Sequence, residues 1–546
     1  MTIAERIADR ARQEGLELYF GLPGSGALMD LMEAGRHVGL DLVLMGHESS
    51  AAITAAYYGY LRGGAGLAIG IKGAGAGNLA AGAVNAFFER MPVVCLCERI
   101  GSGARKEMSQ VCEQEPLFAA VSNATLQVDA AGDAGRTIDA AFAAAAGGRP
   151  GPALLQLPSD QAQNDAGSGP TERPEPRLDG PPPDDAAIAR AARLVSGWQR
   201  PVVILGPDIA LAGASGEVRA LIDRMRPAVL HGFHARGMIR EDDPRFAGVF
   251  MALPGPDILA NRILAEADGA LLIGVDGLSV EGTWDSTLGI PTCELAARPD
   301  FEIVSPATVR VDGDLAASLP ALTAALPART DEGYPTERVA AIRADILARC
   351  FARPPEARLA AQDAVEIARE LLPEDGIMVS ETGVFIVMLD HLWPVTRPDT
   401  FFGSGGARTM GLTVPAALGA KLARPDTPVL GIGGDGSLLM RLGELETFAR
   451  TGAAVPLLII NDQAHGTIRS RQKTRGLDPY SLQFAPVDYA AIARASGLRG
   501  ATVYDPETLR RELAAALGAD VATLIDVRVD PQPYQDSFGP TVGVLS

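Results

Sequence analysis

The stretch 429–462 constrains the fold of this chain more than any other part of the sequence. The apolar run 429–432 ends in a glycine turn at 433–437, and apolar residues then recur at helical spacing over 438–449. A second run, 455–460, is almost wholly apolar, as expected of a parallel strand that is covered on both faces. The stretch therefore predicts a strand, a glycine turn, a helix and a second strand of one parallel sheet.

An acidic side chain follows each of these two predicted strands. Asp435 comes directly after the first strand and Asp462 comes after the second. Because neighbouring strands of a parallel sheet end at the same edge, the two carboxylates are expected to face one crevice. The glycine-lined helix start can bind phosphate through backbone N–H groups, and two carboxylates beside a phosphate suit a hard cation such as Mg²⁺.

Composition indicates a globular protein of several domains. The 546 residues are enough for three to four domains at about 150 residues each. Apolar residues make up 47% of the chain and charged residues 21%, as in soluble folded proteins. Acids outnumber bases by 67 to 48, giving a net charge of −19 without acidic blocks. Nucleic acid and anionic membranes are therefore poor partners for this chain.

The sequence also predicts a cytoplasmic protein. Residues 1–12 are polar and lack the apolar segment of a secretion signal. No uninterrupted apolar run approaches the roughly 18 residues that a membrane-spanning helix needs. The five cysteines are sparse and odd in number, which suits a reducing compartment.

Alternating helical and strand patterns divide the chain into three parts. They occupy residues 1–165, 185–327 and 360–546, and the middle part has four recognisable strands. A Pro- and Gly-rich linker at 162–184 follows the first part, and a charged crossover at 329–358 follows the second. Repeated βα units with buried strands predict an α/β protein of three doubly wound, Rossmann-like αβα domains with mainly parallel sheets.

Two motifs carry a resemblance to thiamine-diphosphate (ThDP) enzymes. The triplet Gly434-Asp435-Gly436, followed about twenty-five residues later by Asn461-Asp462, resembles the Gly-Asp-Gly … Asn-Asn signature of that family, with Asp462 replacing the second asparagine. The segment 47–52, His-Glu-Ser-Ser-Ala-Ala, resembles the His-Glu-x-x-Ala-Ala segment of the acetolactate synthase branch. Taken alone, the triplet could be a turn with surface acids, and Glu48 could be a helix-capping residue. The strand context and the presence of both motifs favour the family.

The resemblance covers essentially the whole chain and implies its domain order. Residues 1–165 would be the pyrimidine-binding domain, 185–327 a middle, transhydrogenase-like domain, and 360–546 the diphosphate-binding domain. The tail from 531 to 546 is irregular and contains aromatic residues, so it is a candidate strap over the site.

The same resemblance implies roles around the cofactor. Glu48 would bind pyrimidine N1′, and a glutamate in apolar surroundings has a raised affinity for a proton. Arg408 stands where the family has glycine and would offer its backbone carbonyl to N4′, while Met410 would support the bent cofactor. The implied metal ligands are Asp435, Asp462 and the backbone oxygen of Ala464. Further cofactor-binding residues implied by the family are Gly383, Val384, Gly434, Gly436, Ser437, His465 and Gly466.

Candidate catalytic residues besides Glu48 are Ser25, Gln110 and His465. Ser25 occupies the position of the serine that binds the substrate carboxylate in benzoylformate decarboxylases, and Gln110 aligns with an active-site glutamine of acetolactate synthases. His465 follows the predicted metal loop and could move protons, since histidine has a pKa near 6.5. A histidine with only a structural role in that loop is the alternative.

Departures from the acetolactate synthase pattern concern the substrate more than the cofactor. Arg471 falls where those enzymes have the tryptophan that selects the second 2-oxo acid, and Asp276 falls where they have an arginine for flavin, so FAD is not expected. Together with Ser25, Lys72 and Arg471 are candidate substrate-binding residues. We expect Lys72, Arg408 and Arg471 to receive an anionic group of the substrate, because guanidinium groups suit carboxylate, sulfonate or phosphate. Ordinary surface cations are the alternative.

The resemblance therefore implies a ThDP- and Mg²⁺-dependent enzyme that cleaves or forms C–C bonds next to a carbonyl. The reaction would be 2-oxo acid decarboxylation with or without carboligation. Alternatives are a simple decarboxylase resembling benzoylformate decarboxylase, an enzyme resembling 2-hydroxyacyl-CoA lyase or oxalyl-CoA decarboxylase, and a non-catalytic ThDP-binding paralogue. In this family Glu48 of one chain would meet the diphosphate-binding domain of another, which implies a homodimer or homotetramer.

Overall fold

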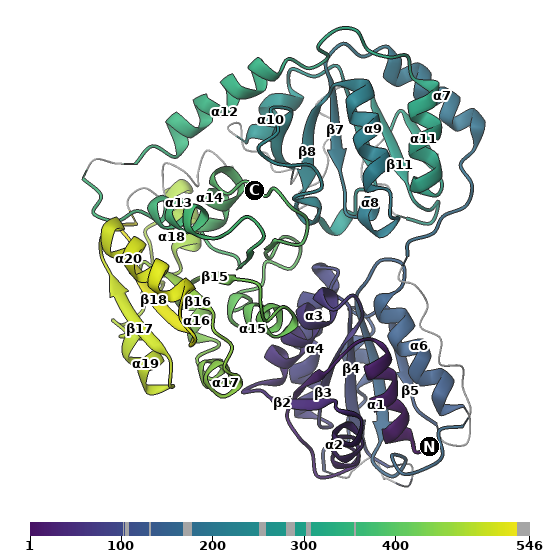
Figure 1. Ribbon diagram of the computed structural model, residues 1–546, viewed down its shortest axis with the longest axis vertical. Coiled ribbons are helices and arrows are strands. Elements are labelled where there is room, and N and C mark those ends of the chain that lie inside the picture. The colour runs from purple at the N-terminus through teal and green to yellow at the C-terminus, as the bar shows by residue number, and fades with distance from the viewer. Residues whose placement is uncertain are drawn as a thin grey trace.

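The protein is built from three six-stranded sheets. The computed structural model describes residues 1–101, 103, 109–129, 133–167, 177–250, 258–279, 290–301, 307–353 and 356–531. Every pair of neighbouring strands in the three sheets is parallel, and helices cover their faces (Figure 1). The predicted fold class, α/β with three doubly wound domains, is confirmed. Within the described ranges no helix has the length and apolar character needed to cross a bilayer.

The first sheet has the order β2-β1-β3-β4-β6-β5. Its strands are β1 (Leu18–Gly21), β2 (Asp41–Leu44), β3 (Gly66–Gly70), β4 (Val93–Arg99), β5 (Ala124–Gln127) and β6 (Pro152–Pro158). The second sheet has the order β12-β11-β10-β7-β8-β9. Its strands are β7 (Pro201–Leu205), β8 (Ala228–Gly232), β9 (Phe246–Phe250), β10 (Gly269–Ile273), β11 (Thr292–Ala296) and β12 (Val309–Asp312).

The third sheet positions the predicted cofactor site. Its order is β14-β13-β15-β16-β18-β17. Its strands are β13 (Ile377–Ser380), β14 (Phe401–Phe402), β15 (Val429–Gly434), β16 (Pro456–Asn461), β17 (Arg499–Val503) and β18 (Thr523–Arg528). The opening motif lies at its centre, because β15 pairs with β13 on one side and with β16 on the other. The acids that follow these three strands therefore lie at one edge of the sheet.

The helices alternate with the strands along the chain. Those of the first domain are α1 (Ile3–Gln13), α2 (Ala27–Val38), α3 (Glu48–Leu61), α4 (Ala74–Phe88), α5 (Glu115–Phe118) and α6 (Ala134–Ala146). The middle part contains α7 (Asp185–Ser196), α8 (Asp208–Leu211), α9 (Ser215–Met225), α10 (Leu259–Leu264), α11 (Leu315–Ala325), α12 (Thr336–Cys350) and the 3-10 helices η1 (Phe233–Ala235) and η2 (Gly277–Ser279). The last part contains α13 (Ala361–Leu371), α14 (Phe385–Leu392), α15 (Thr413–Ala423), α16 (Asp435–Leu439), α17 (Glu444–Thr451), α18 (Gly466–Thr474), α19 (Tyr489–Ala495) and α20 (Pro506–Leu517).

The structure differs from the predicted elements in two places. The single helix predicted over 438–449 is broken into α16 and α17. Arg441 lies in the break, where its guanidinium donates hydrogen bonds to the Gly411 carbonyl (3.1 Å) and to Ser49 Oγ (2.7 Å). The bond to Ser49 reaches into the first domain and the bond to Gly411 reaches a remote loop of the third, so the side-chain period alone did not reveal the break. The middle sheet also has two strands, β9 and β11, beyond the four that were predicted.

Helix α3 joins the first and third domains. It is rich in alanine and almost wholly buried, and small side chains allow a neighbouring backbone to approach closely. A Cβ atom at Gly419 of α15 would lie only 2.4 Å from the Thr54 carbonyl oxygen, and Thr54 Oγ1 donates to the Pro415 carbonyl at 3.0 Å. The two domains therefore share one continuous hydrophobic core.

A second junction connects the middle and third domains through buried charges. The Arg236 guanidinium donates to both oxygens of Glu241, at 3.0 and 2.8 Å, and to the Trp393 carbonyl at 2.7 Å. Glu241 also accepts a hydrogen bond from the backbone N–H of Val395 at 2.9 Å. Burial alone would raise the pKa of Glu241, but Arg236 and His231 lower this pKa to about 2.

The carboxyl edge of the middle sheet is occupied by ion pairs. Asp208 follows β7 and Asp276 follows β10, the strand beside it. Arg149 of the first domain donates to Asp208 at 2.8 Å, lies 3.4 Å from Asp276, and stacks on Phe301. Arg90 holds the same Asp276 at 2.5 Å. These pairs lie at the edge where doubly wound sheets generally bind nucleotides.

We predict that Glu241→Gln lowers the stability of the folded protein by about 3–5 kcal/mol at neutral pH, because it leaves the buried Arg236 charge unpaired. The carboxylate stabilises the fold above its usual pKa of 4.5, and that contribution is lost as pH falls toward about 2. The difference between parent and variant, measured by denaturant unfolding, should therefore shrink over that range.

Glu374→Gln is the matched control, since Glu374 pairs with Arg240 on the surface, where ion pairs contribute little. Equal unfolding midpoints for Glu241→Gln and Glu374→Gln at pH 7 would contradict the prediction.

Candidate active site

A cavity of about 200 Å³ lies where β13, β15 and β16 end. Every predicted cofactor-binding residue except Glu48 lines it. The lining consists of Thr382, Gly383, Val384, Phe385, Arg408, Met410, Gly434, Asp435, Gly436, Ser437, Ile460, Asp462, Ala464, His465, Gly466, Thr467 and Ile468. The cavity thus brings together residues from four separate segments of the third domain.

Asp435 lines this cavity and has a buried carboxylate group. Its side chain lies at the start of α16, and Oδ1 accepts a hydrogen bond from the backbone N–H of Gly436 at 2.9 Å. The other oxygen, Oδ2, is buried without a hydrogen-bond partner among the described groups. Burial and the nearby Asp462 carboxylate raise the pKa of Asp435 to about 7. A cation bound at Oδ2 would satisfy that oxygen and offset the repulsion.

Asp462 is balanced by an arginine from the following helix. Arg469 Nη2 lies 2.5 Å from Asp462 Oδ2, and Oδ1 accepts a hydrogen bond from the backbone N–H of Ala464 at 3.3 Å. Burial raises the pKa of Asp462, while Arg469 opposes that rise. Asp462, which replaces the second asparagine of the family signature, therefore has a positive partner in Arg469, seven residues further along the chain.

The donor set fits a divalent cation held jointly with a phosphate. The described residues contain no group of three or more His, Cys, Asp and Glu side chains that could hold a metal by themselves. Asp435 and Asp462 supply two carboxylates beside the start of α16, and Ala464 can add a backbone oxygen. Mg²⁺ usually takes one or two carboxylates and completes its shell with water and phosphate oxygens, so the residues present fit it.

Glu381 is a buried acid at this edge that the sequence analysis missed. It follows β13, and Oε1 accepts the backbone N–H of Gly434 at 2.9 Å while Oε2 accepts that of Thr413 at 3.3 Å. Burial raises the pKa of Glu381 to about 7. The signal for it was available, since Glu381 directly follows an apolar strand that ends at the same edge as Asp435. It holds the turn at the end of β15 in place.

The loop after β16 presents backbone and imidazole groups to the cavity. Gln463 has a left-handed backbone (φ 56°), and the loop pairs with residues 482–484 through the backbone bonds of His465 to Leu482 and of Phe484 to Gln463. The His465 ring packs edge-on against Phe484 at 4.8 Å. These contacts fix the direction in which His465 and Ala464 face the cavity.

The first domain carries a separate cluster around Glu48. Glu48 is buried in the first turn of α3, and its Oε2 accepts a hydrogen bond from Asn78 Nδ2 at 2.9 Å. A Cβ atom at Gly75 would lie 3.1 Å from Glu48 Oε1, so glycine at this position leaves room beside that oxygen.

Lys72, Ser25 and Gln110 lie in the same domain. Lys72 Nζ pairs with the buried Glu98 at 2.5 Å, and the turn that contains Ser25 packs against the same carboxylate through Gly26. Ser25 and Gln110 are exposed, and Gln110 lies beside Gly73 with a left-handed backbone (φ 64°). Because Lys72 already has an anionic partner, it is a weaker candidate for binding a substrate anion than its sequence position indicated.

A single chain does not assemble all the predicted site residues. Glu48, Ser25, Lys72 and Gln110 do not line the cavity of the third domain, and neither does Arg471, which lies one turn further along α18 than the lining residues. Of the candidate strap at 531–546, residues 532–546 lie outside the described residues. Within one chain, the candidate residues of the first domain and the cavity of the third domain are therefore two separate groups.

Comparison with known protein families matches all three parts of the chain. The family described as "Thiamine pyrophosphate enzyme, N-terminal TPP binding domain" matches residues 1–120, the central domain of the same enzymes matches 188–292, and their C-terminal TPP binding domain matches 381–527.

Curated relatives align over nearly the whole chain. The acetolactate synthase large subunit of Parasynechococcus marenigrum is 31% identical over 96% of this chain and 87% of its own length. The acetolactate synthase of Bacillus subtilis is 27% identical over 98% of this chain and 94% of its own length. The large subunit of acetolactate synthase isozyme 2 from Escherichia coli is 26% identical over 97% and 96%.

Proposed function

This chain belongs to the thiamine pyrophosphate enzyme family, in its acetolactate synthase branch, and from that membership we propose that it decarboxylates a 2-oxo acid and joins the remaining fragment to a second carbonyl compound. It is a ThDP-dependent enzyme of the carboligase and decarboxylase kind. The observation that carries the finer proposal is the cavity at the end of β15, because the predicted cofactor residues line it and one of them, Asp435, has a buried carboxylate oxygen without a described partner.

Asp435, Asp462 and the Ala464 carbonyl would hold Mg²⁺ against the diphosphate, and Met410 and Arg408 would hold the rings. When bound, ThDP supplies a nucleophilic carbon that adds to the substrate carbonyl and stabilises the charge left by departing carbon dioxide. Glu48 would hold a proton on Oε1, the oxygen that Asn78 does not occupy, and exchange it with pyrimidine N1′.

We infer that the complete site forms between two chains. Glu48 and the third-domain cavity are separate half-sites in one chain, and a two-fold arrangement can bring the Glu48 of each chain to the cavity of the other. A homodimer is the smallest assembly that completes the site, and a homotetramer would contain two such pairs.

We propose that the substrate carries an additional anionic group, which Arg471 receives. Arg471 lies on α18, the helix whose first residues line the cavity, in place of the tryptophan of acetolactate synthases. Arg408, in the cavity wall, is a second candidate. Lys72 is bound to Glu98, so its contribution would be to orient that carboxylate rather than to supply free charge.

We propose that the middle domain does not use FAD. Asp276 stands at the position of the flavin-binding arginine and is buried between Arg90 and Arg149. A flavin phosphate at this edge would face the carboxylates of Asp208 and Asp276 and would have to displace Arg149 from both. The ion pairs would instead hold the first and middle domains together.

Simple decarboxylation of the benzoylformate decarboxylase type is the second candidate, because Ser25 is exposed on a turn that packs beside Glu98. The two candidates differ in their products. A carboligase releases a hydroxyketone or hydroxy acid from two substrates, whereas a simple decarboxylase releases an aldehyde.

We predict that cofactor retention depends strongly on the metal, because Asp462 places a second carboxylate beside the diphosphate. EDTA should release ThDP from the parent protein, and Asp462→Asn should reduce that release because it removes one negative charge. The measurement is the ThDP that remains bound after gel filtration. Asp426→Asn, which removes a charge from an exposed position of the same domain, should behave like the parent. Equal ThDP affinity with and without EDTA would count against the metal site.

Mixing two inactive variants tests the shared site. Glu48→Gln and Asp435→Asn should each reduce turnover by about 10²-fold or more. When they are co-expressed in equal amounts, half of the dimers contain one chain of each kind, and one of the two sites in such a dimer is intact. About a quarter of parent activity should therefore return. No recovery in purified mixed dimers would show that each site lies within one chain.

A panel of 2-oxo acids, with products identified by mass, tests the reaction and the role of Arg471 together. Arg471→Ala should raise KM about tenfold or more for acids that carry a second anionic group, since it removes a charge-assisted hydrogen bond. KM for singly charged acids should stay unchanged. Lys473→Ala, an exposed cation on the same helix, is the control. An unchanged KM for every dianionic acid with Arg471→Ala would refute the assignment, and release of an aldehyde alone would select the simple decarboxylase.

A further inference from the structure

Glu89 accepts an unusual number of hydrogen bonds from one distant loop. It caps the C-terminal end of α4 and is almost fully buried (1% exposed). Its carboxylate accepts hydrogen bonds from Ser404 Oγ (3.2 Å) and from the backbone N–H groups of Gly405, Gly406 and Ala407 (3.2, 3.4 and 2.8 Å). Three consecutive N–H groups that point at one carboxylate form a concave anion site, and here the anion is a side chain of the first domain.

The same helix also holds the next part of the loop. Asn85, one turn before Glu89, donates from Nδ2 to Thr409 Oγ1 at 3.0 Å. Inside the loop, the Thr409 N–H donates to Ser404 Oγ at 2.6 Å. A Cβ atom at Gly406 would lie 2.4 Å from the Phe88 carbonyl oxygen, so the loop backbone packs directly on the end of α4.

The loop leads into the cofactor cavity and contains a strained residue. Arg408 and Met410 line that cavity, whereas Glu89 does not. Arg408 has a left-handed backbone (φ 51°), a conformation that residues with a Cβ atom rarely adopt. Such a conformation persists only where the surroundings hold it. The bonds from α4 lie immediately before and after Arg408.

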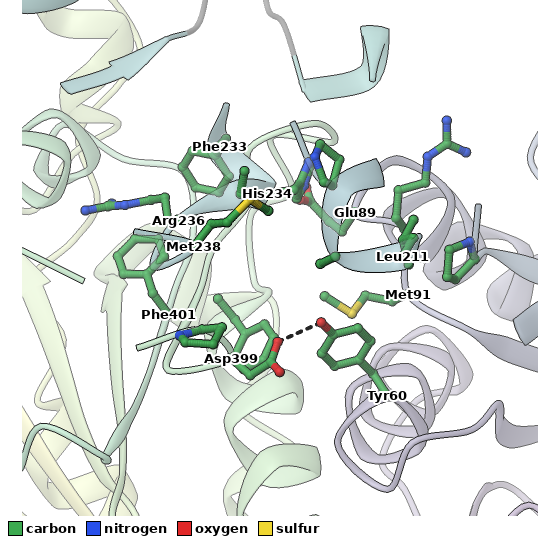
Figure 2. Close-up of a pocket in the computed structure, with 18 of the residues that line it drawn as sticks. Tyr60, Glu89, Met91, Leu211, Phe233, His234, Arg236, Met238, Asp399 and Phe401 are labelled. Carbon is green, nitrogen blue, oxygen red and sulfur yellow. Dashed lines mark hydrogen bonds and ion pairs between the residues drawn. The ribbon is translucent and has the colours of Figure 1, made fainter. Parts of the chain in front are cut away.

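The middle domain contacts the same carboxylate. His234 Nε2, from η1, lies 2.7 Å from Glu89 Oε2. Figure 2 shows Glu89 and His234 side by side at the wall of a cavity of about 160 Å³, which Phe233 and Phe401 also line. Glu89 therefore joins all three domains where the loop to the cofactor begins.

We propose that Glu89, assisted by Asn85, is a positioning residue that fixes residues 404–410, so that the Arg408 carbonyl and Met410 meet the cofactor in the correct geometry. The proposal rests on the proposed function only in assigning the cofactor contacts to Arg408 and Met410. Glu89 itself does not line the cofactor cavity.

Hydrogen exchange of the cofactor-free protein tests the positioning directly. Glu89→Gln replaces one acceptor oxygen with an NH₂ group, which cannot accept hydrogen bonds from the N–H groups of the loop. Because the loop then loses some of the bonds that hold it, amides in the segment 403–411 should exchange about tenfold faster or more. Glu14→Gln is the matched control, because Glu14 is also a buried acid of the first domain that accepts a backbone N–H, that of Ala65. It should leave exchange in 403–411 unchanged. If Glu89→Gln altered that exchange no more than Glu14→Gln does, the proposal would be wrong, whatever reaction the enzyme catalyses.

Turnover and spectroscopy of the loaded protein complete the test. At saturating ThDP, kcat of Glu89→Gln should fall about tenfold or more while KM for the 2-oxo acid stays within twofold, and the near-ultraviolet circular dichroism of the bound aminopyrimidine should change. Thr409→Val removes only the hydroxyl that Asn85 binds, so it should give the same changes in kcat and in the spectrum, but smaller ones. This variant replaces Glu89→Gln in the test if Glu89→Gln folds poorly. Faster exchange with unchanged kcat and an unchanged spectrum in both variants would overturn the role in positioning the cofactor.

Discussion

The close packing of α3 against α15 determines how the first and third domains lie relative to each other. Alanine side chains on α3 and Gly419 on α15 let the two backbones meet, and the Thr54 hydroxyl bonds to the Pro415 carbonyl at the contact. With that junction in place, the start of α3 presents Glu48 and the end of α4 reaches the third-domain loop that leads into the cofactor cavity. Larger side chains at this contact would separate the helices and alter both arrangements, since packed interiors have little room to adjust.

Buried acids hold several loops and domain junctions of this molecule in place, and their partners are of two kinds, arginine side chains and backbone N–H groups. Glu241 faces an arginine, Glu381 and Glu89 face mainly backbone N–H groups, and Asp276 faces two arginines from another domain. Asp435 differs from them because one of its oxygens is buried without a described partner. Protein interiors seldom leave a carboxylate oxygen unsatisfied, so this oxygen, on a residue that lines the cavity, supports the proposal that a bound cation completes the surroundings of Asp435.

Sequence patterns predicted the fold class well, because strand and helix periods are local properties. The apolar runs before Asp435 and Asp462, and the rule that parallel strands end at one edge, were enough to place both acids beside one cavity. Partners that are remote in the chain could not be predicted in the same way. Nothing local in the sequence singles out Glu89, since its donors lie more than three hundred residues away. Lys72 looked like a free cation because nothing local indicated its pairing with Glu98. The helix break at Arg441 depends on acceptors in two other segments, and the roles assigned to Glu48, Ser25 and Gln110 remain predictions.

Helix α4 has a consequence for how two sites in a dimer would behave. Its 15 residues span about 22 Å. Near its first turn Asn78 holds Glu48, which in the proposed dimer serves the partner's cofactor, and at its far end Asn85 and Glu89 hold the loop around the chain's own cofactor. One rigid helix would thus touch both reaction centres. In the proposed dimer the loop around one cofactor and the glutamate that serves the other would therefore be anchored on the same helix, which is the kind of contiguous physical link that coupling between the two centres would require.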